Sequence, residues 1–81
     1  MKENIKNNLF KVFKTVFETS IDSLNMNINQ NSFENWDSLN HILLIVEIEN
    51  EFNIKFNSGE LSELTSMNKL YETILKHLKN N

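Results

Sequence analysis

The chain contains no proline and a single glycine, Gly59. These two residue types supply the backbone conformations of most tight turns, and a fold built from many strands needs a turn after nearly every strand. Several stretches instead repeat apolar residues three or four positions apart, which is the spacing of one face of an α-helix. The sequence therefore predicts an all-α fold, and its 81 residues are enough for one domain with a small core.

The two longest helices are expected in the first two thirds of the chain. The first covers about residues 4–18, where apolar residues stand at positions 5, 9, 12, 13, 16 and 17. The second begins at about Ser38 and continues to Phe52. Asp37 is its predicted cap, because an aspartate carboxylate at this position can accept a hydrogen bond from a free backbone N–H of the first turn.

Two further helices are expected near the end of the chain. Ser58 is predicted to cap a short helical turn that holds Leu61 and Leu64, and Thr65 or Ser66 is predicted to cap the last helix. The apolar residues of the last helix follow helical spacing: Met67, Leu70, Tyr71, Ile74, Leu75 and Leu78. Residues 1–81 are thus predicted to form a single domain, a small four-helix bundle with three main helices and one short helix.

Residues 19–36 separate the first two helices and show no helical spacing. Polar residues dominate this stretch, and single apolar residues stand between them at Ile21, Leu24, Met26 and Ile28. A loop of this length is unusual in a compact domain and is often functional. We expect its apolar residues to hold it against the core.

Charge is unevenly distributed along the chain. Residues 1–14 hold four lysines against Glu3, giving +3, and residues 15–64 hold nine acids against Lys55, giving −8. Residues 65–81 hold three lysines against Glu72, giving +2. An acidic middle segment argues against nucleic-acid binding, which needs a basic face. It suits a partner with a basic surface.

Several other classes are disfavoured by composition. The chain has no cysteine, so neither a disulfide nor a thiolate metal site can form. No run of about 18 apolar residues is present, so no membrane span is expected. The N-terminal sequence lacks the apolar region and cleavage site of a secretory signal, which predicts a cytoplasmic protein. His41 and His77 are far apart and lack close partners of metal-ligand type, so no metal site is predicted.

The second predicted helix has more apolar residues than one buried face requires. With about 100° between successive residues, one side of the helix holds Leu44, Ile45, Ile48 and Phe52, joined by His41. Another side holds Leu39, Ile42, Leu43 and Val46. Either the helix is central and packed on both sides, or this second group is an exposed patch for a partner, bordered by Glu47, Glu49 and Glu51.

The string Asp-Ser-Leu-Asn occurs twice, around Ser23 and around Ser38. Ser23 lies in the polar stretch, whereas Ser38 begins a helix. The first turn of a helix presents unpaired N–H groups and the positive pole of the helix dipole, which favour a nearby anion such as a phosphate. Ser38 is therefore the better attachment point for a phosphate-linked group, with Asp37 holding the start of the helix.

Residues 36–56, "WDSLNHILLIVEIENEFNIKF", resemble the signature of the second helix of acyl carrier proteins. The shared features are Asp-Ser-Leu, an apolar and acidic helix, Glu-x-Glu-Phe, and an apolar-x-apolar exit. The order of a first amphipathic helix, a long loop, the Asp-Ser-Leu helix, a short helix and a last helix also matches the family. The resemblance covers essentially the whole chain.

The resemblance implies a non-catalytic carrier with 4′-phosphopantetheine attached to Ser38. A phosphopantetheinyl transferase would install this group from coenzyme A with Mg²⁺, with Asp37 and Leu39 beside the attachment site. The terminal thiol would then hold acyl groups as thioesters for acyl-loading and acyl-processing enzymes. A monomer is expected, without catalytic residues or a metal of its own.

The resemblance also implies two sets of contact residues. Partner enzymes in the family contact the second helix, which places Leu39 and the following residues in partner binding: Ile42, Leu43, Val46, Glu47 and Glu49. Acyl carriers can shelter the acyl chain between their helices. The residues expected to line that pocket are Ile45, Leu61 and Leu64.

Some positions depart from the fatty-acid carriers. Those proteins usually have acids where this chain has Asn40 and Leu43, and a run of acids where it has Asn50 between two glutamates. The string Trp-Asp-Ser-Leu-Asn-His is more like stand-alone carriers of specialised pathways. A dedicated partner enzyme is therefore expected.

Three alternatives were compared with an acyl carrier. One is a carrier of aminoacyl or peptidyl groups, although Asp37 before the serine favours acyl cargo. Another is an unmodified helical interaction module that binds a partner through the same apolar residues. A hydrolase triad of Asp37, Ser38 and His41 is disfavoured, because Asp37 neighbours the serine and no glycine-rich oxyanion loop is visible.

Overall fold

The computed structural model describes residues 2–19, 24–32 and 36–79. These residues form helices α1 (Lys2–Phe17), α2 (Ser38–Phe52), α3 (Ser58–Leu61) and α4 (Met67–Lys79). Within the described ranges the extended pairing is one isolated bridge between Asn29 and Ser66. The predicted all-α fold, with three main helices and one short helix, is confirmed.

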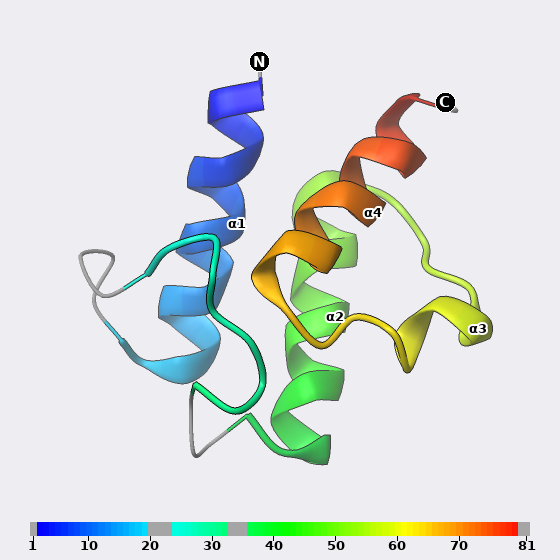
Figure 1. The fold of residues 1–81 in the computed structure, drawn as a ribbon. Coiled ribbons are helices and arrows are strands. Elements are labelled where there is room, and N and C mark those ends of the chain that lie inside the picture. Colours follow the sequence, from blue (N-terminus) through cyan, green and yellow to red (C-terminus); the bar gives the residue numbers. More distant parts are fainter. Residues whose placement is uncertain (1, 20–23, 33–35, 80–81) are drawn as a thin grey trace.

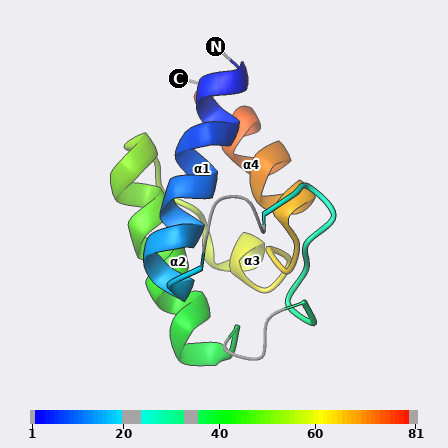
Figure 2. The ribbon, with the colours of Figure 1, turned by 90° about the vertical axis from the view of Figure 1, so that its left-hand side faces the viewer.

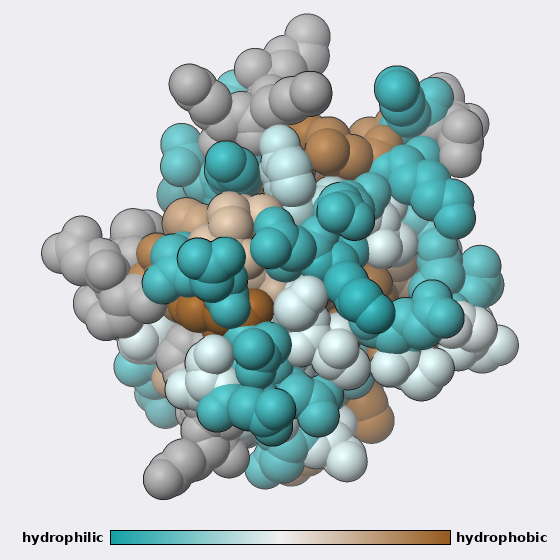
Figure 3. All heavy atoms as spheres, viewed as in Figure 1, coloured by the Kyte–Doolittle hydropathy of each residue, from teal (hydrophilic) through white to brown (hydrophobic). Residues whose placement is uncertain are grey.

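Helices α1, α2 and α4 surround the core, and the short α3 lies to one side, in the connection from the end of α2 to the start of α4 (Figure 1). The start of α1 and the end of α4 lie at the same end of the bundle, while the start of α2 lies at the opposite end (Figure 1 and Figure 2). The face shown in Figure 3 is mostly hydrophilic, with small hydrophobic areas between the polar side chains. The fold thus places Ser38 at the end of the bundle away from both chain ends.

Helix α2 begins and ends at residues whose chemistry suits a helix boundary. The carboxylate of Asp37 accepts a hydrogen bond from the backbone N–H of Asn40 at 2.9 Å, so the predicted cap is confirmed. At the other end Asn53 adopts the left-handed conformation with φ of 55°, and its N–H donates to the carbonyl of Glu49. Asparagine adopts this conformation more readily than most residues, and it therefore ends the helix.

The predicted cap of α3 is wrong by one residue. Asn57 is the cap: its side-chain oxygen accepts from the N–H of Glu60 at 2.9 Å, and its own N–H donates to the Glu60 carboxylate at 3.0 Å. This reciprocal pair needs an acidic residue or glutamine three positions after the cap, and Ser58 has Leu61 there. Because α3 ends at Leu61, Leu64 lies outside it.

Helix α4 begins after Ser66. The Ser66 hydroxyl accepts a hydrogen bond from the N–H of Lys69 at 3.2 Å, which selects Ser66 over Thr65 as the capping side chain. The Thr65 carbonyl instead accepts from the N–H of Gln30 at 2.9 Å, and the N–H of Met67 donates to the carbonyl of Ile28 at 2.8 Å. The segment before α2 is therefore bonded to the start of α4.

The described residues of the long loop are held on the core as expected. Leu24 and Ile28 are buried, and Met26 is half-buried. Ile21 and Ser23 lie outside the described residues. An apolar residue at every second position lets an irregular segment bury part of its surface while the asparagines between remain exposed.

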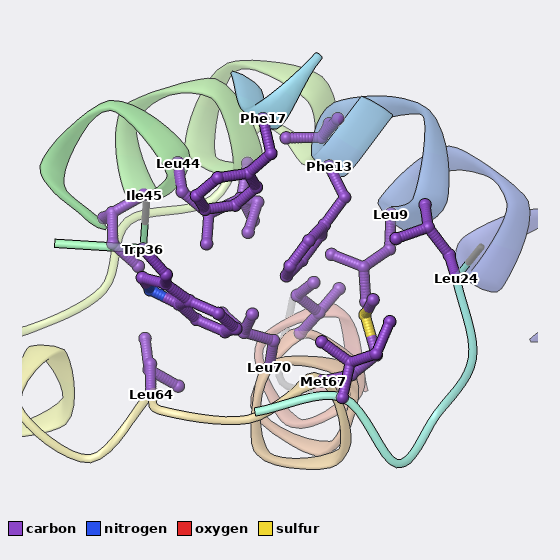
Figure 4. Close-up of a cluster of buried hydrophobic side chains, with 14 of the residues drawn as sticks. Leu9, Phe13, Phe17, Leu24, Trp36, Leu44, Ile45, Leu64, Met67 and Leu70 are labelled. Carbon is purple, nitrogen blue, oxygen red and sulfur yellow. The ribbon is translucent and has the colours of Figure 1, made fainter. Parts of the chain in front are cut away.

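Trp36 connects the loop to the centre of the bundle. Its ring meets Phe13 edge to face at a centroid distance of 5.4 Å, and Phe17 at 5.6 Å. Figure 4 shows the indole extending from the end of the loop between α2 and the side chains of Leu64 and Leu70. These aromatic residues belong to one hydrophobic core, whose largest fully buried side chains are Leu9, Phe13, Leu44, Ile48, Leu64, Met67, Leu70 and Ile74.

Glu60 holds α3 against α4. Its carboxylate lies 2.9 Å from Nε2 of His77 and 4.0 Å from Nζ of Lys76. The N–H of Asn57 is the main cause that lowers the pKa of Glu60 below its ordinary value of 4.5. Burial opposes it as the next largest cause, and His77 and Lys76 each lower the pKa by less. A carboxyl group whose pKa is lowered by folding stabilises the fold above its ordinary pKa, and this stabilisation is lost as pH falls through the lowered value.

We therefore expect the free energy of unfolding to fall below pH 4.5 more steeply in the wild type than in Glu60→Gln, because the amide cannot titrate. Urea unfolding between pH 3 and 7, followed by circular dichroism, measures this difference. Glu63→Gln is the control, because Glu63 is an exposed acid in the turn after α3. Identical pH profiles for Glu60→Gln and the wild type would contradict the assignment.

Candidate functional site

Ser38 is the first residue of α2, and its side chain is exposed at the end of the bundle. Asp37 precedes it in an extended conformation, and the carbonyl of Asp37 accepts from the N–H of His41 at 2.8 Å. The hydroxyl of Ser38 therefore lies at the positive pole of a 15-residue helix. A group attached to this hydroxyl can extend into solvent, and a phosphate there is stabilised by the helix dipole.

His41 joins three segments of the chain at this end of the bundle. The indole N–H of Trp36 donates to Nδ1 of His41 at 3.0 Å, so Nδ1 carries no proton and Nε2 does. The Nε2–H then donates to the carbonyl of Leu61 at 3.1 Å. Both ring nitrogens are thus engaged away from Ser38, so His41 is not placed as a general base for that serine.

A cavity of about 380 Å³ opens beside Ser38, and we call it the Ser38 cavity. Its walls combine the polar groups of hydrogen-bonding side chains with apolar surface, including that of an indole and a leucine. The residues that line it are Gln30, Trp36, Asp37, Ser38, His41, Leu61, Ser62 and Thr65. They come from the loop before α2, the first turn of α2 and the turn after α3, so the cavity is built by tertiary contacts.

The second apolar side of α2 is exposed. The exposed fractions are 67% for Leu39, 59% for Ile42, 48% for Leu43 and 45% for Val46, and we call these four residues the apolar patch. The interpretation of a helix packed on both sides is therefore wrong, and only the side with Leu44, Ile45 and Ile48 is buried. Exposed apolar residues grouped in this way mark an interaction surface.

The acids beside the patch differ in their surroundings. Glu47 and Glu51 are exposed, whereas Glu49 is half-buried and its carboxylate accepts from the N–H of Phe56 at 2.8 Å. Glu49 therefore holds the chain that leaves α2. Its predicted contact with a partner stays a prediction, as does that of Glu47.

A second space of about 220 Å³ lies between α2 and α3, and we call it the apolar groove. It is lined by His41, Ile42, Ile45, Val46, Glu49 and Leu61. Two of the three residues predicted for an acyl pocket, Ile45 and Leu61, thus face the same space. Leu64 does not line it: the turn after α3 directs Leu64 into the core, where it is 1% exposed.

Sequence reasoning did not find several of the residues that shape this site. The bonds of His41 to Trp36 and Leu61, and the presence of Gln30, Ser62 and Thr65 in the cavity wall, depend on how distant segments meet. Only Trp36 and His41 stood out in the sequence, because they flank the Asp-Ser-Leu string. Within the described residues, no three histidine, aspartate or glutamate side chains gather as metal ligands.

No helix in the described part of the chain has the length and hydropathy needed to cross a membrane. No protein-family model and no curated protein matches the sequence.

Among solved structures, the chain is similar to a holo acyl carrier protein from Geobacter metallireducens, determined by solution NMR. The two proteins share 33% sequence identity and superimpose with a TM-score of 0.82. The match covers 93% of this chain and 86% of the other. With this identity along nearly all of both chains, and with an exposed serine at the start of α2, the chain belongs to the acyl carrier protein family.

Proposed function

We propose that this protein is a non-catalytic acyl carrier whose Ser38 bears 4′-phosphopantetheine. The observation that carries the proposal is the position of Ser38, exposed in the first turn of α2 with Asp37 as cap and a cavity of mixed polar and apolar lining beside it. These residues fit the group, because the helix start favours its phosphate and the exposed position of Ser38 lets the arm extend from the bundle. The holo state of the matched carrier supports the same assignment.

The chain's own residues have distinct parts in this function. On modification, the Ser38 oxygen would form a bond to the phosphorus of the phosphopantetheine half of coenzyme A. The diphosphate bond would break and release adenosine 3′,5′-bisphosphate, while the hydroxyl proton would pass to a base of the transferase. Asp37 keeps the first turn of α2 formed and marks the serine for the transferase. When attached, the group supplies a terminal thiol that holds an acyl group as a thioester.

The apolar patch is the proposed docking surface for the transferase and for acyl-loading and acyl-processing enzymes. It begins at Leu39, next to Ser38, and its acidic neighbours Glu47 and Glu51 are exposed. Apolar residues supply most of the binding energy of such a surface, while the rim charges steer a partner with a basic surface. Fatty-acid carriers usually have an acid at the position of Leu43, so this chain has one more apolar residue on the surface. This difference supports a partner enzyme that is specific to this carrier.

We expect Ile42→Asp to lower kcat/KM of a phosphopantetheinyl transferase for this protein by about 10-fold to 100-fold, because truncating or charging a central interface residue costs roughly 1.4–3 kcal/mol. Ile42 is 59% exposed, so the fold should be retained. Asn7→Asp on exposed α1 adds the same charge away from the patch and serves as the matched control. Equal kcat/KM for both variants would show that the patch does not dock the transferase.

The direct test is intact mass after incubation with coenzyme A, Mg²⁺ and a broad-specificity phosphopantetheinyl transferase. The expected result is one added phosphopantetheine per chain. If the folded protein gains no mass with this transferase and with a second one, the proposal fails and an unmodified interaction module is favoured.

A second assay distinguishes a carrier of acyl groups from a carrier of aminoacyl groups. The holo protein is offered to an adenylating enzyme with amino acids and to an acyl-loading enzyme with an acyl donor. We expect loading by the acyl enzyme only. Loading with an amino acid would make the protein an aminoacyl or peptidyl carrier. The predicted cytoplasmic location and monomeric state stay predictions.

A further inference from the structure

The space between α2 and the end of α3 is divided into two parts by one pair of residues. The Ser38 cavity and the apolar groove share two wall residues, His41 and Leu61. The hydrogen bond from His41 Nε2–H to the Leu61 carbonyl, at 3.1 Å, joins these shared residues. The boundary between the two spaces is therefore a bonded contact between α2 and the last residue of α3.

His41 is also fixed on its other side. Its ring stacks on Trp36 at a centroid distance of 6.2 Å and an interplanar angle of 24°, and it accepts the indole N–H at 3.0 Å. Trp36 is itself 7% exposed and packs on Phe13 and Phe17. If the imidazole turned away, both hydrogen bonds would break and a nearly buried N–H would lose its partner, which is unfavourable.

The two spaces differ in chemistry. Gln30, Ser62 and Thr65 line the Ser38 cavity, and an aliphatic chain lying there would cover these polar groups without pairing them. Ile42, Ile45 and Val46 line the apolar groove, where an aliphatic chain would be stabilised by burial. The direct way from Ser38 to the groove passes the His41–Leu61 contact.

From these contacts we infer that His41 determines which cargo this carrier shelters. The Ser38 cavity takes a compact acyl group that carries a hydroxyl or another hydrogen-bonding substituent, and the His41–Leu61 contact keeps a long aliphatic chain out of the apolar groove. This inference rests on the proposed function, because it requires an acylated arm on Ser38.

The experiment loads ¹³C-methyl-labelled protein with 3-hydroxybutyryl or octanoyl phosphopantetheine, using the corresponding coenzyme A thioester and the broad-specificity transferase. Three proteins are compared: wild type, His41→Ala and His41→Gln. Glutamine can still donate to the Leu61 carbonyl and occupies similar space, so His41→Gln is the matched control for His41→Ala. The methyl signal of Ile45 reports on the groove, and that of Thr65 together with the Trp36 indole N–H reports on the Ser38 cavity.

In the wild type, the 3-hydroxybutyryl form should shift the Thr65 and Trp36 signals, and the octanoyl form should leave the Ile45 methyl where it is in the holo protein. His41→Ala should show a shift of Ile45 on octanoylation that is several times larger than in wild type and in His41→Gln. An Ile45 shift in octanoylated wild type as large as in His41→Ala would overturn the inference, and so would the absence of a shift in folded His41→Ala. Failure of the proposed function gives a different result: the intact mass of the protein does not increase with either coenzyme A thioester.

Discussion

Replacement of Ser38 by alanine is expected to abolish the addition of phosphopantetheine completely. In the proposed function the hydroxyl oxygen is the atom that bonds to phosphorus, and alanine has no oxygen to replace it. The fold should survive, because Ser38 is exposed, Asp37 rather than Ser38 caps α2, and alanine has the highest helix propensity. Intact mass after the transferase reaction measures the loss, and circular dichroism verifies that the variant is folded.

Two other serines serve as controls for this experiment. Ser58→Ala removes an exposed serine from the first position of α3, the same place in a different helix. Ser23→Ala removes the serine of the other Asp-Ser-Leu-Asn string. Both variants should gain one phosphopantetheine. Addition that persists in Ser38→Ala and disappears in Ser23→Ala would move the attachment site to the first string.

The second large effect is expected for Phe13→Ala, which should lower the free energy of unfolding by about 3–5 kcal/mol. Phe13 is fully buried, and its ring contacts both Phe17 and Trp36 at centroid distances of 5.4 Å. Small domains are stable by only about 5–15 kcal/mol, so this change removes much of the total. Urea unfolding followed by circular dichroism gives the difference.

Lys14→Ala is the control for Phe13→Ala, because Lys14 is the next residue of α1 and is exposed. Lys14→Ala is expected to change the free energy of unfolding by less than about 0.5 kcal/mol. A loss below about 1 kcal/mol for Phe13→Ala would mean that the core repacks around the missing ring, since full burial otherwise predicts a larger cost. Trp36 would then need another support to hold His41 in place.

Local features of the fold were predictable because neighbouring residues decide them. The cap at Asp37 depends on a bond to Asn40, three residues away, and the buried side of α2 follows from the spacing of Leu44, Ile45 and Ile48. The proposal that Ser38 is the attachment site rests on the same local argument. The exposure of the second apolar side of α2 could not be predicted, because helical spacing does not say how many other helices pack against a helix.

The rest of the site depends on contacts between distant parts of the chain. The carbonyl that receives the His41 bond belongs to Leu61, twenty residues later, and Gln30 reaches the cavity because its N–H is bonded to Thr65. The resemblance predicted Leu64 for the acyl pocket together with Leu61, and the turn after α3 places Leu64 in the core. Every residue has a backbone carbonyl, so the sequence does not indicate which carbonyl accepts a hydrogen bond from a distant side chain.

The positions of the chain ends have a practical consequence for this carrier. The start of α1 and the end of α4 lie at the same end of the bundle, and the start of α2, where Ser38 stands, lies at the far end. A fused enzyme, a flexible tether or a solid support attached at either terminus would therefore leave the serine and the apolar patch facing outward. Carriers could be strung together or immobilised through their termini while each one still presented its cargo.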